Sequence, residues 1–199
     1  MSTSRLDDFE GDIARARDLV GLGQSIGNMT NGLVDSTDLY RAALVQSVAA
    51  WDRYVHGIVL DRAVDIMLGR LPAGSSSRIG LPLNSVAMLV NAPDIAAREL
   101  AARSFFAERL TTETYQRPDD VAAALAMVGV KAIWSTAFKS AQQAKVAIGV
   151  IVDRRNKIVH QCDYDPVFPG TVTSLVPSDA TDALLVVSNT VHAIDPYCK

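Results

Sequence analysis

One long segment without a helix breaker constrains this chain most. Residues 37–68 contain no proline and a single glycine, Gly57, while Ser36 can cap the segment and Asp38 suits its first turn. On a helical wheel of about 100° per residue, its large apolar side chains gather on one face, namely Leu44, Val48, Trp51, Val55, Val59 and Ile66. The segment therefore predicts a long core helix that ends near Gly69.

Proline, glycine and capping signals predict the other helices, over residues 5–20, 84–90, 93–110, 118–129, 134–161 and 178–194. Asn84 is the expected cap of the second of these helices. The glycines between 21 and 27 are interpreted as part of a plain loop and not as a phosphate loop, because no strand precedes them. Irregular connectors are expected over residues 71–83 and 162–177.

The composition suits one helical domain. A chain of 199 residues with 49% hydrophobic and 21% charged side chains can bury one sizeable core. It has no internal repeat and no convincing alternating strand pattern beyond residues 170–176, so the predicted class is all-α. We expect a single domain in which an N-terminal helix and loop, residues 1–35, pack on a helical bundle, residues 36–199.

The net charge and the cysteine content limit which functions are possible. The formal charge of −3 and the isoelectric point near 5.6 exclude a global basic field, so any nucleic-acid contact would be local. Cys162 and Cys198 match neither a disulfide framework nor a zinc motif. The first residues are polar, and no apolar stretch reaches membrane-spanning length. We expect a soluble cytoplasmic protein with no metal and no cofactor.

Two charged residues occupy positions where the wheels place apolar side chains. Arg155 falls in the middle of a stripe formed by Ile148, Ile151, Val152, Ile158 and Val159. Asp52 lies on the flank of the apolar face of the 37–68 helix. Because a lone buried charge is costly, we expect Asp52 and Arg155 to approach each other. Taken alone, this pattern favours a structural ion pair between two core helices.

His160 adds a proton-transfer group to the helix of Arg155. Asp153, Asn156 and His160 share a polar face of a regular helix, whereas Arg155 and His160 are about 140° apart. A twofold axis could bring these residues from two copies into one cleft. Histidine moves protons near neutral pH and a guanidinium holds a phosphate, so such a cleft suits attack of a ribose 2′-hydroxyl on the adjacent phosphodiester.

These residues resemble those of a known family. Residues 49–55, Ala-Ala-Trp-Asp-Arg-Tyr-Val, and residues 153–160, Asp-Arg-Arg-Asn-Lys-Ile-Val-His, are similar to the HEPN superfamily and most similar to its RiboL-PSP-type branch. The loop and helix of residues 165–194 are similar too, so the resemblance covers about residues 36–195. It implies a dimeric helical bundle in which an R-x4-6-H motif cleaves RNA without a metal and commonly leaves a cyclic phosphate.

The resemblance assigns roles to residues of this chain. It makes Arg155 and His160 catalytic. Three further residues are expected to support the site, namely Asn156, Asp52 and Asp153. Arg154 and Lys157 are expected to bind RNA at its rim. The expected partners are a second copy, RNA, and a cognate antitoxin or another defence-system protein, because many relatives are toxins or antiviral effectors.

One position departs from the family pattern. HEPN toxins paired with a nucleotidyltransferase antitoxin carry a tyrosine two residues beyond the histidine, where it can be modified. This chain has Cys162 there. A regulatory tyrosine would therefore have to be Tyr164.

Two alternatives to a ribonuclease stay open from the sequence. One is a catalytically inactive HEPN module that binds RNA, a nucleotide or a partner protein, and the other is a structural bundle in which Asp52 and Arg155 form a buried brace. His56, one turn after Asp52, is a secondary candidate for the cleft. Trp51 and Trp134 are expected in the core or at a dimer contact, because stacking on RNA bases requires exposure.

Overall fold

The chain folds into helices, as its breaker pattern predicts. The computed structural model describes residues 4–72, 82–165, 167–168 and 170–199. Within these ranges the helices are α1 (Ser4–Met29), α2 (Thr37–Met67), α3 (Leu83–Val90), α4 (Ile95–Leu110), α5 (Pro118–Met127), α6 (Ile133–Ala137), α7 (Ala141–Gln161), α8 (Pro177–Ile194) and the 3-10 helix η1 (Asp195–Tyr197). The all-α prediction is confirmed for the described chain, which contains an isolated bridge between Tyr164 and Val172 but no strand.

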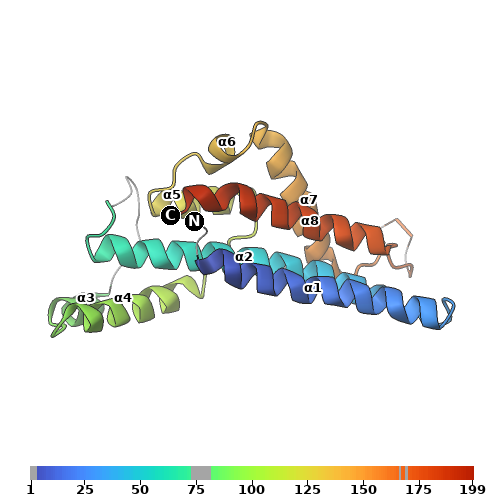
Figure 1. Cartoon of the computed structure of the whole chain (residues 1–199), viewed down its shortest axis with the longest axis horizontal. Helices are drawn as coiled ribbons and strands as arrows, with labels where there is room; N and C mark the ends of the chain where they lie inside the picture. The colour runs from blue at the N-terminus through green and yellow to red at the C-terminus, as the bar shows by residue number, and fades with distance from the viewer. Residues whose placement is uncertain (1–3, 73–81, 166, 169) are drawn as a thin grey trace.

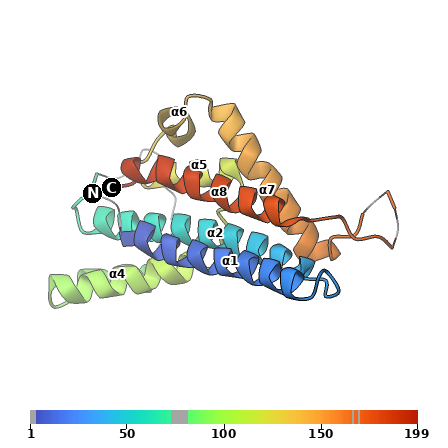
Figure 2. The same ribbon diagram turned by 45° about the vertical axis from the view of Figure 1, so that its right-hand side comes forward.

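Three long helices form the body of the molecule. Figure 1 shows α1 and α2 running antiparallel, with α8 lying along them, and α7 crossing this layer obliquely. Helix α4 lies along the C-terminal half of α2 (Figure 2), and α3 packs against α4. Within the described ranges, no helix combines the length and the apolar character that a membrane crossing requires.

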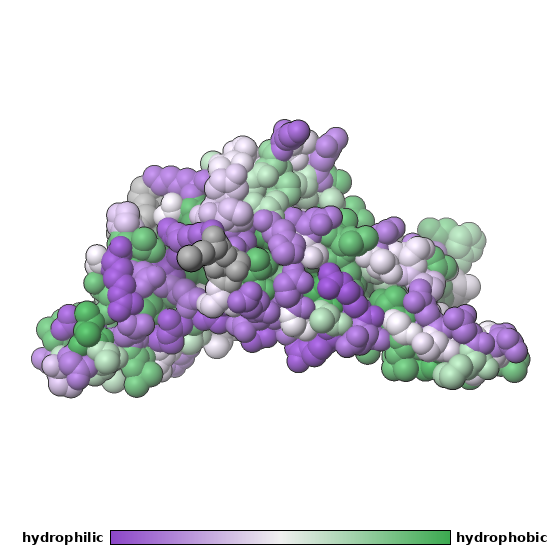
Figure 3. Space-filling view, in the orientation of Figure 1, coloured by the Kyte–Doolittle hydropathy of each residue, from purple (hydrophilic) through white to green (hydrophobic). Residues whose placement is uncertain are grey.

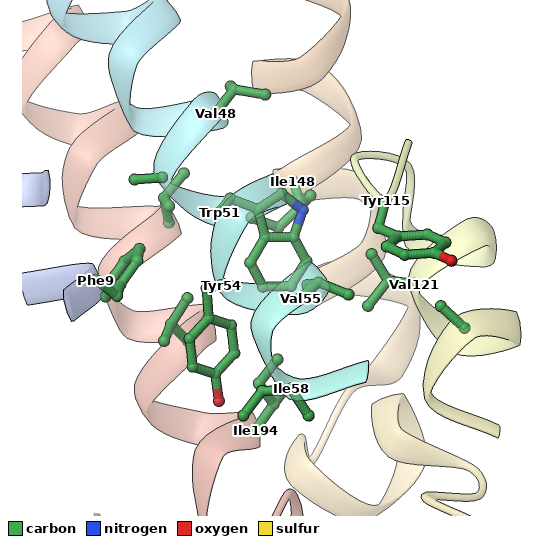
Figure 4. Close-up of a cluster of buried hydrophobic side chains, with 14 of the residues drawn as sticks. Phe9, Val48, Trp51, Tyr54, Val55, Ile58, Tyr115, Val121, Ile148 and Ile194 are labelled. Carbon is green, nitrogen blue, oxygen red and sulfur yellow. The ribbon is translucent and has the colours of Figure 1, made fainter. Parts of the chain in front are cut away.

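The core surrounds the apolar face of α2, as the sequence predicts. Trp51 is 1% exposed and lies among side chains from α1, α7 and α5 (Figure 4). Trp134 is also buried, with its ring centroid 6.5 Å from that of Trp51. Both indoles donate hydrogen bonds to carbonyls where α5 begins, Trp51 to that of Gln116 and Trp134 to that of Pro118. The tryptophans therefore fix the segment before α5 as well as filling the core.

The first helix is longer than predicted. α1 continues through Gly21 and Gly23 to Met29, so the glycine-rich stretch is helical and the predicted loop from residue 21 is wrong. Gly23 is buried, and a Cβ atom there would lie 2.6 Å from Cε1 of Tyr40. The absence of a side chain therefore lets α1 approach α2, a tertiary reason for glycine that the local pattern could not reveal.

The predicted helix over residues 134–161 is divided in two. Phe138 is extended and its ring stacks on that of Trp134 at 5.6 Å, while Ser140 caps α7 by accepting a hydrogen bond from the amide of Gln143. The lack of proline therefore did not ensure a continuous helix, because a capping serine begins a new one.

The other predicted helix starts differ less. Asp94, predicted within the first turn of this helix, instead caps α4 by accepting from the amide of Ala97. Asn84 is not a cap, since α3 begins at Leu83 after Pro82. Most of the predicted connector over residues 71–83 lies outside the described residues.

Hydrophobic side chains gather at the end of the molecule formed by α3 and α4. Figure 3 shows green atoms at this end, while hydrophilic residues cover much of the central face. The exposed apolar residues of these two helices are Leu83, Met88, Val90, Ile95 and Leu100. This end lies away from the part of α7 that carries Arg155 and His160 (Figure 1).

Candidate functional site

The C-terminal end of α7 carries the candidate motif and ends in a sharp turn. Cys162 and Asp163 both adopt left-handed backbone, with φ of 49° and 58°, and both amides donate to the carbonyl of Lys157. This turn reverses the chain. The loop that follows is held against α7 and α2, beside the last turns of α7.

Arg155 has a guanidinium that no anionic group of the described chain engages. Its side chain is half-buried, and Nη1 donates to Oδ1 of Asn156 at 2.9 Å. Every other arginine within the described ranges contacts a carboxylate or a backbone carbonyl. His160 is exposed in the last turn of α7. Arg155 thus presents a cation and His160 a proton carrier, and neither has an acidic partner in the described chain.

The stripe around Arg155 is buried only in part. Ile148, Ile151 and Val152 belong to the core, but Val159 is 49% exposed, so the prediction that it faces the core is wrong. A helical wheel gives the direction of a side chain but not the point at which the neighbouring helices stop covering it. The core-facing stripe of α7 therefore continues onto the surface at Val159.

A groove runs between this end of α7 and the start of α2. It has a volume of about 820 Å³, and its walls include Ala42 and Val45 of α2 and Ile158 and Cys162 at the end of α7. Ala42 is exposed and Val45 half-buried. Small apolar side chains therefore border the motif on the α2 side.

Asp52 does not pair with Arg155. Its carboxylate accepts hydrogen bonds from the amide of Tyr115 at 2.6 Å and from Nε2 of Gln116 at 3.4 Å. No hydrogen bond or ion pair joins Asp52 to Arg155 in the described chain, so the predicted brace is wrong. The amides before α5 satisfy the carboxylate instead, and Asp52 holds that segment in place.

The guanidinium of Arg154 is engaged by groups of the fold itself. Its Nη2 lies 2.8 Å from Oδ2 of Asp163 and also donates to the carbonyls of Thr173 and Ser174. The Asp163 side chain has no exposed surface and receives a second arginine, Arg41, at 2.9 Å. The structure therefore contradicts an RNA-binding role for Arg154, because its guanidinium neutralises a buried carboxylate.

Sequence reasoning missed this cluster of Arg41, Arg154 and Asp163. The available signal was Arg41, which stands three residues before Leu44 and seven before Val48, on the core face of α2. The Arg41 side chain is 13% exposed, and its guanidinium contacts Asp38, Asp163 and the carbonyl of Thr173. The cluster fixes the loop after α7. Burial alone would lower the pKa of Arg41, but the effect of its carboxylate partners is larger and raises this pKa.

Three of the other candidate residues are exposed, and the fourth, His56, lies away from Arg155. Asp153 is exposed and paired with Arg117 at 3.0 Å, Lys157 is exposed, and Tyr164 is 52% exposed in the loop. His56 does not join Arg155, since its ring nitrogens contact the carbonyls of Asp52 and Glu113.

Comparisons test whether the resemblance extends to known proteins. No family model, curated protein or solved structure matches the chain significantly. The HEPN resemblance therefore stays a prediction based on residues 49–55 and 153–160. Within the described chain, no group of three or more histidine, cysteine, aspartate and glutamate side chains could hold a metal ion.

Proposed function

We propose that this chain is a metal-independent endoribonuclease whose active site forms between two copies. The observation that carries the proposal is the available guanidinium of Arg155 on the same helix as the exposed His160. Neighbouring charges on α7 are engaged, Arg154 by Asp163 and Asp153 by Arg117. The part of α7 left for a ligand thus combines an anion-binding group with a proton carrier.

Geometry favours a site made by two copies. Arg155 and His160 are separated by about 140° around the helix and about 7.5 Å along it. One copy therefore directs them to different sides. A twofold contact would place Arg155 of one copy near His160 of the other, and it would cover Val159, which is 49% exposed, and Ala49, which is exposed on α2.

The chemistry proceeds by transesterification within the RNA. One His160 takes the proton of the ribose 2′-hydroxyl while the 2′-oxygen attacks the adjacent phosphorus, and Arg155 compensates the charge that builds on the phosphate oxygens. The bond to the 5′-oxygen then breaks, and that oxygen takes a proton from water. The products are a 2′,3′-cyclic phosphate and a 5′-hydroxyl, and His160 returns the proton that it accepted to the solvent.

The HEPN resemblance supports a biological setting for this activity. Members of that superfamily are commonly toxins or antiviral effectors, so we propose the same role here, with RNA as substrate and an antitoxin or defence protein as partner. Lys157, which is exposed, is proposed to contact the RNA backbone. Tyr164 is the exposed tyrosine closest in sequence to the motif and is the candidate for regulatory modification.

Mixed dimers test the site directly. Arg155→Ala and His160→Ala should each abolish cleavage of single-stranded RNA in buffer that contains a chelator, with the oligomeric state unchanged. Mixing the two inactive variants should restore cleavage, because each mixed dimer keeps one Arg155 and one His160 on different copies. Cleavage by either variant alone at the wild-type rate would contradict the assignment. No recovery in verified mixed dimers would contradict a site shared between copies.

A further inference from the structure

A second cavity lies beside the segment that leads into α5. It has a volume of about 270 Å³ and is bordered by the C-terminal end of α4, the loop over residues 111–117 and α5. Its lining residues include Arg109, Leu110, Glu113, Tyr115, Ala124 and Met127. The cavity could accommodate a single flat ring system with room for its substituents.

Tyr115 brings a buried hydroxyl to this cavity. The residue is 4% exposed, and its hydroxyl oxygen has no hydrogen-bond partner in the described chain. Figure 4 shows the hydroxyl pointing away from Trp51 and toward α5, which forms the far wall. Burial raises the pKa of Tyr115 to about 12, so the hydroxyl is a hydrogen-bond donor at neutral pH. A buried polar group without a partner is uncommon and points to a ligand.

The Tyr115 ring cannot turn away to satisfy this hydroxyl without breaking other contacts. Its backbone amide donates to Asp52, and its ring packs on His56 with the centroids 4.5 Å apart. His56 is itself held by the carbonyls of Asp52 and Glu113. The hydroxyl is therefore preorganised at the cavity wall, as a binding group is.

The remaining walls indicate the class of ligand. Leu110, Ala124 and Met127 offer apolar contact, and a methionine sulfur packs well against aromatic rings. The polar lining has one cation, Arg109, and two carboxylates, Glu113 and Asp120, so it disfavours a phosphate or another free anion. An uncharged planar heterocycle with both donors and acceptors at its edge matches this set. A nucleobase has these properties.

The cavity is connected to the proposed active site through short contacts. Asp52 binds the Tyr115 amide, and Arg117, two residues after Tyr115, binds Asp153 of α7. Asp153 precedes Arg155 by two residues. We propose that the cavity receives one unpaired base of the RNA strand and so sets the base preference of cleavage, an inference that rests on the proposed ribonuclease function.

Two substitutions test the cavity, and one matched substitution controls for them. Tyr115→Phe removes only the hydroxyl, and Ala123→Leu narrows the opening from an exposed position on α5. Tyr197→Phe removes an exposed hydroxyl elsewhere and serves as the control. All three changes are made in full-length His160→Ala protein, which allows RNA binding to be measured without cleavage.

The binding measurement uses the four ribonucleosides, which carry no phosphate, and short single-stranded RNAs. At least one nucleoside should shift the amide resonances of residues 113–116, and its affinity should fall about tenfold in Tyr115→Phe, as loss of one hydrogen bond predicts. The thermal stability of ligand-free Tyr115→Phe should be unchanged or higher, since the lost hydroxyl has no partner. The Tyr197→Phe control should bind as the parent does.

The outcomes separate this inference from the proposed function. No nucleoside shift at residues 113–116, or equal affinity in all variants, would overturn the base site even if RNA is cleaved. Nucleoside binding without a matching shift by RNA would overturn the assignment to the RNA strand. If the protein binds bases here but wild type cleaves no RNA, the base site stands and the ribonuclease proposal fails. In an active enzyme, Tyr115→Phe should flatten the base preference at the cleavage position while retaining cleavage.

Discussion

The guanidinium of Arg154 lies 2.8 Å from a carboxylate oxygen of Asp163, a residue whose side chain has no exposed surface. The guanidinium of the next residue along α7, Arg155, donates to the neutral side chain of Asn156 and pairs with no carboxylate of the described residues. Two adjacent arginines thus serve different purposes. One neutralises a buried charge that anchors the loop after α7, and the other remains available to an external anion.

Substitution of these two arginines should lower the stability of the fold by different amounts. Arg154→Ala should lower the free energy of unfolding by roughly 1.5–3 kcal/mol, because Asp163 loses a charged hydrogen-bond donor while Arg41 remains. Arg155→Ala should lower it by less than about 1 kcal/mol, since no buried carboxylate depends on it. Urea unfolding of both variants measures the difference. A larger loss of stability in Arg155→Ala would show that Arg155 is a structural brace after all.

Asp52 should support the segment before α5. Asp52→Ala leaves the Tyr115 amide without its acceptor and should cost roughly 1–3 kcal/mol. Hydrogen exchange should become faster at Tyr115 and its neighbours, with less change in α7. If the fastest new exchange occurred around Arg155 instead, the contact between Asp52 and the Tyr115 amide would not be the main role of this carboxylate.

The ion pairs of Asp61 should make stability sensitive to acid. Burial opposes ionisation of Asp61, but hydrogen bonds from Arg5 and Arg103 outweigh it and lower the pKa of Asp61. A lowered folded-state pKa stabilises the protein above the unfolded pKa of about 3.9, and this contribution disappears as pH falls through the folded value.

The difference in unfolding free energy between wild type and Asp61→Asn should therefore be largest above about pH 5 and should shrink below about pH 4. Urea unfolding across this range provides the measurement. The exposed Asp182→Asn variant is the control and should differ little from wild type at any pH. A difference in unfolding free energy between wild type and Asp61→Asn that does not change with pH would contradict the role assigned to ionised Asp61.

Two glycines of α1 should respond in opposite directions to the same change. Gly23→Ala places a Cβ atom 2.6 Å from the Tyr40 ring and should destabilise the protein by roughly 1–3 kcal/mol. Gly21 has no atom within 4 Å of an added Cβ, so Gly21→Ala should stabilise it by roughly 0.5–1 kcal/mol. Thermal unfolding of both variants checks the packing of α1 on α2. Stabilisation by both changes would mean that α1 does not approach Tyr40 so closely.

The two cysteines should differ in reactivity. Cys162 is exposed, whereas Cys198 is 3% exposed and burial raises its pKa to about 12. Because the thiolate is the reactive form, a maleimide should label Cys162 in the native protein and Cys198 only after unfolding. Peptide mass spectrometry after timed labelling identifies the site. Equal labelling of both residues under native conditions would indicate that the C-terminal end opens readily.

The sequence by itself determined the helical class and the identity of the motif helix. Helix periodicity and breakers act over a few residues, so the bounds of α2, α4, α5 and α8 could be predicted closely, as could the burial of Trp51. The same local signals named Arg155 and His160 and placed them on different faces of one helix. That placement needs only the pitch of the helix.

Tertiary structure decided how the charges are used. Arg154 and Arg155 are chemically identical in the sequence, and only the turn at Cys162 and Asp163 brings a buried carboxylate to the first of them. Asp52 likewise could have met Arg155, but the amides before α5 reach it instead. The first pairing depends on a left-handed turn and the second joins α2 to a segment 63 residues away, so neither follows from the periodicity of a helix.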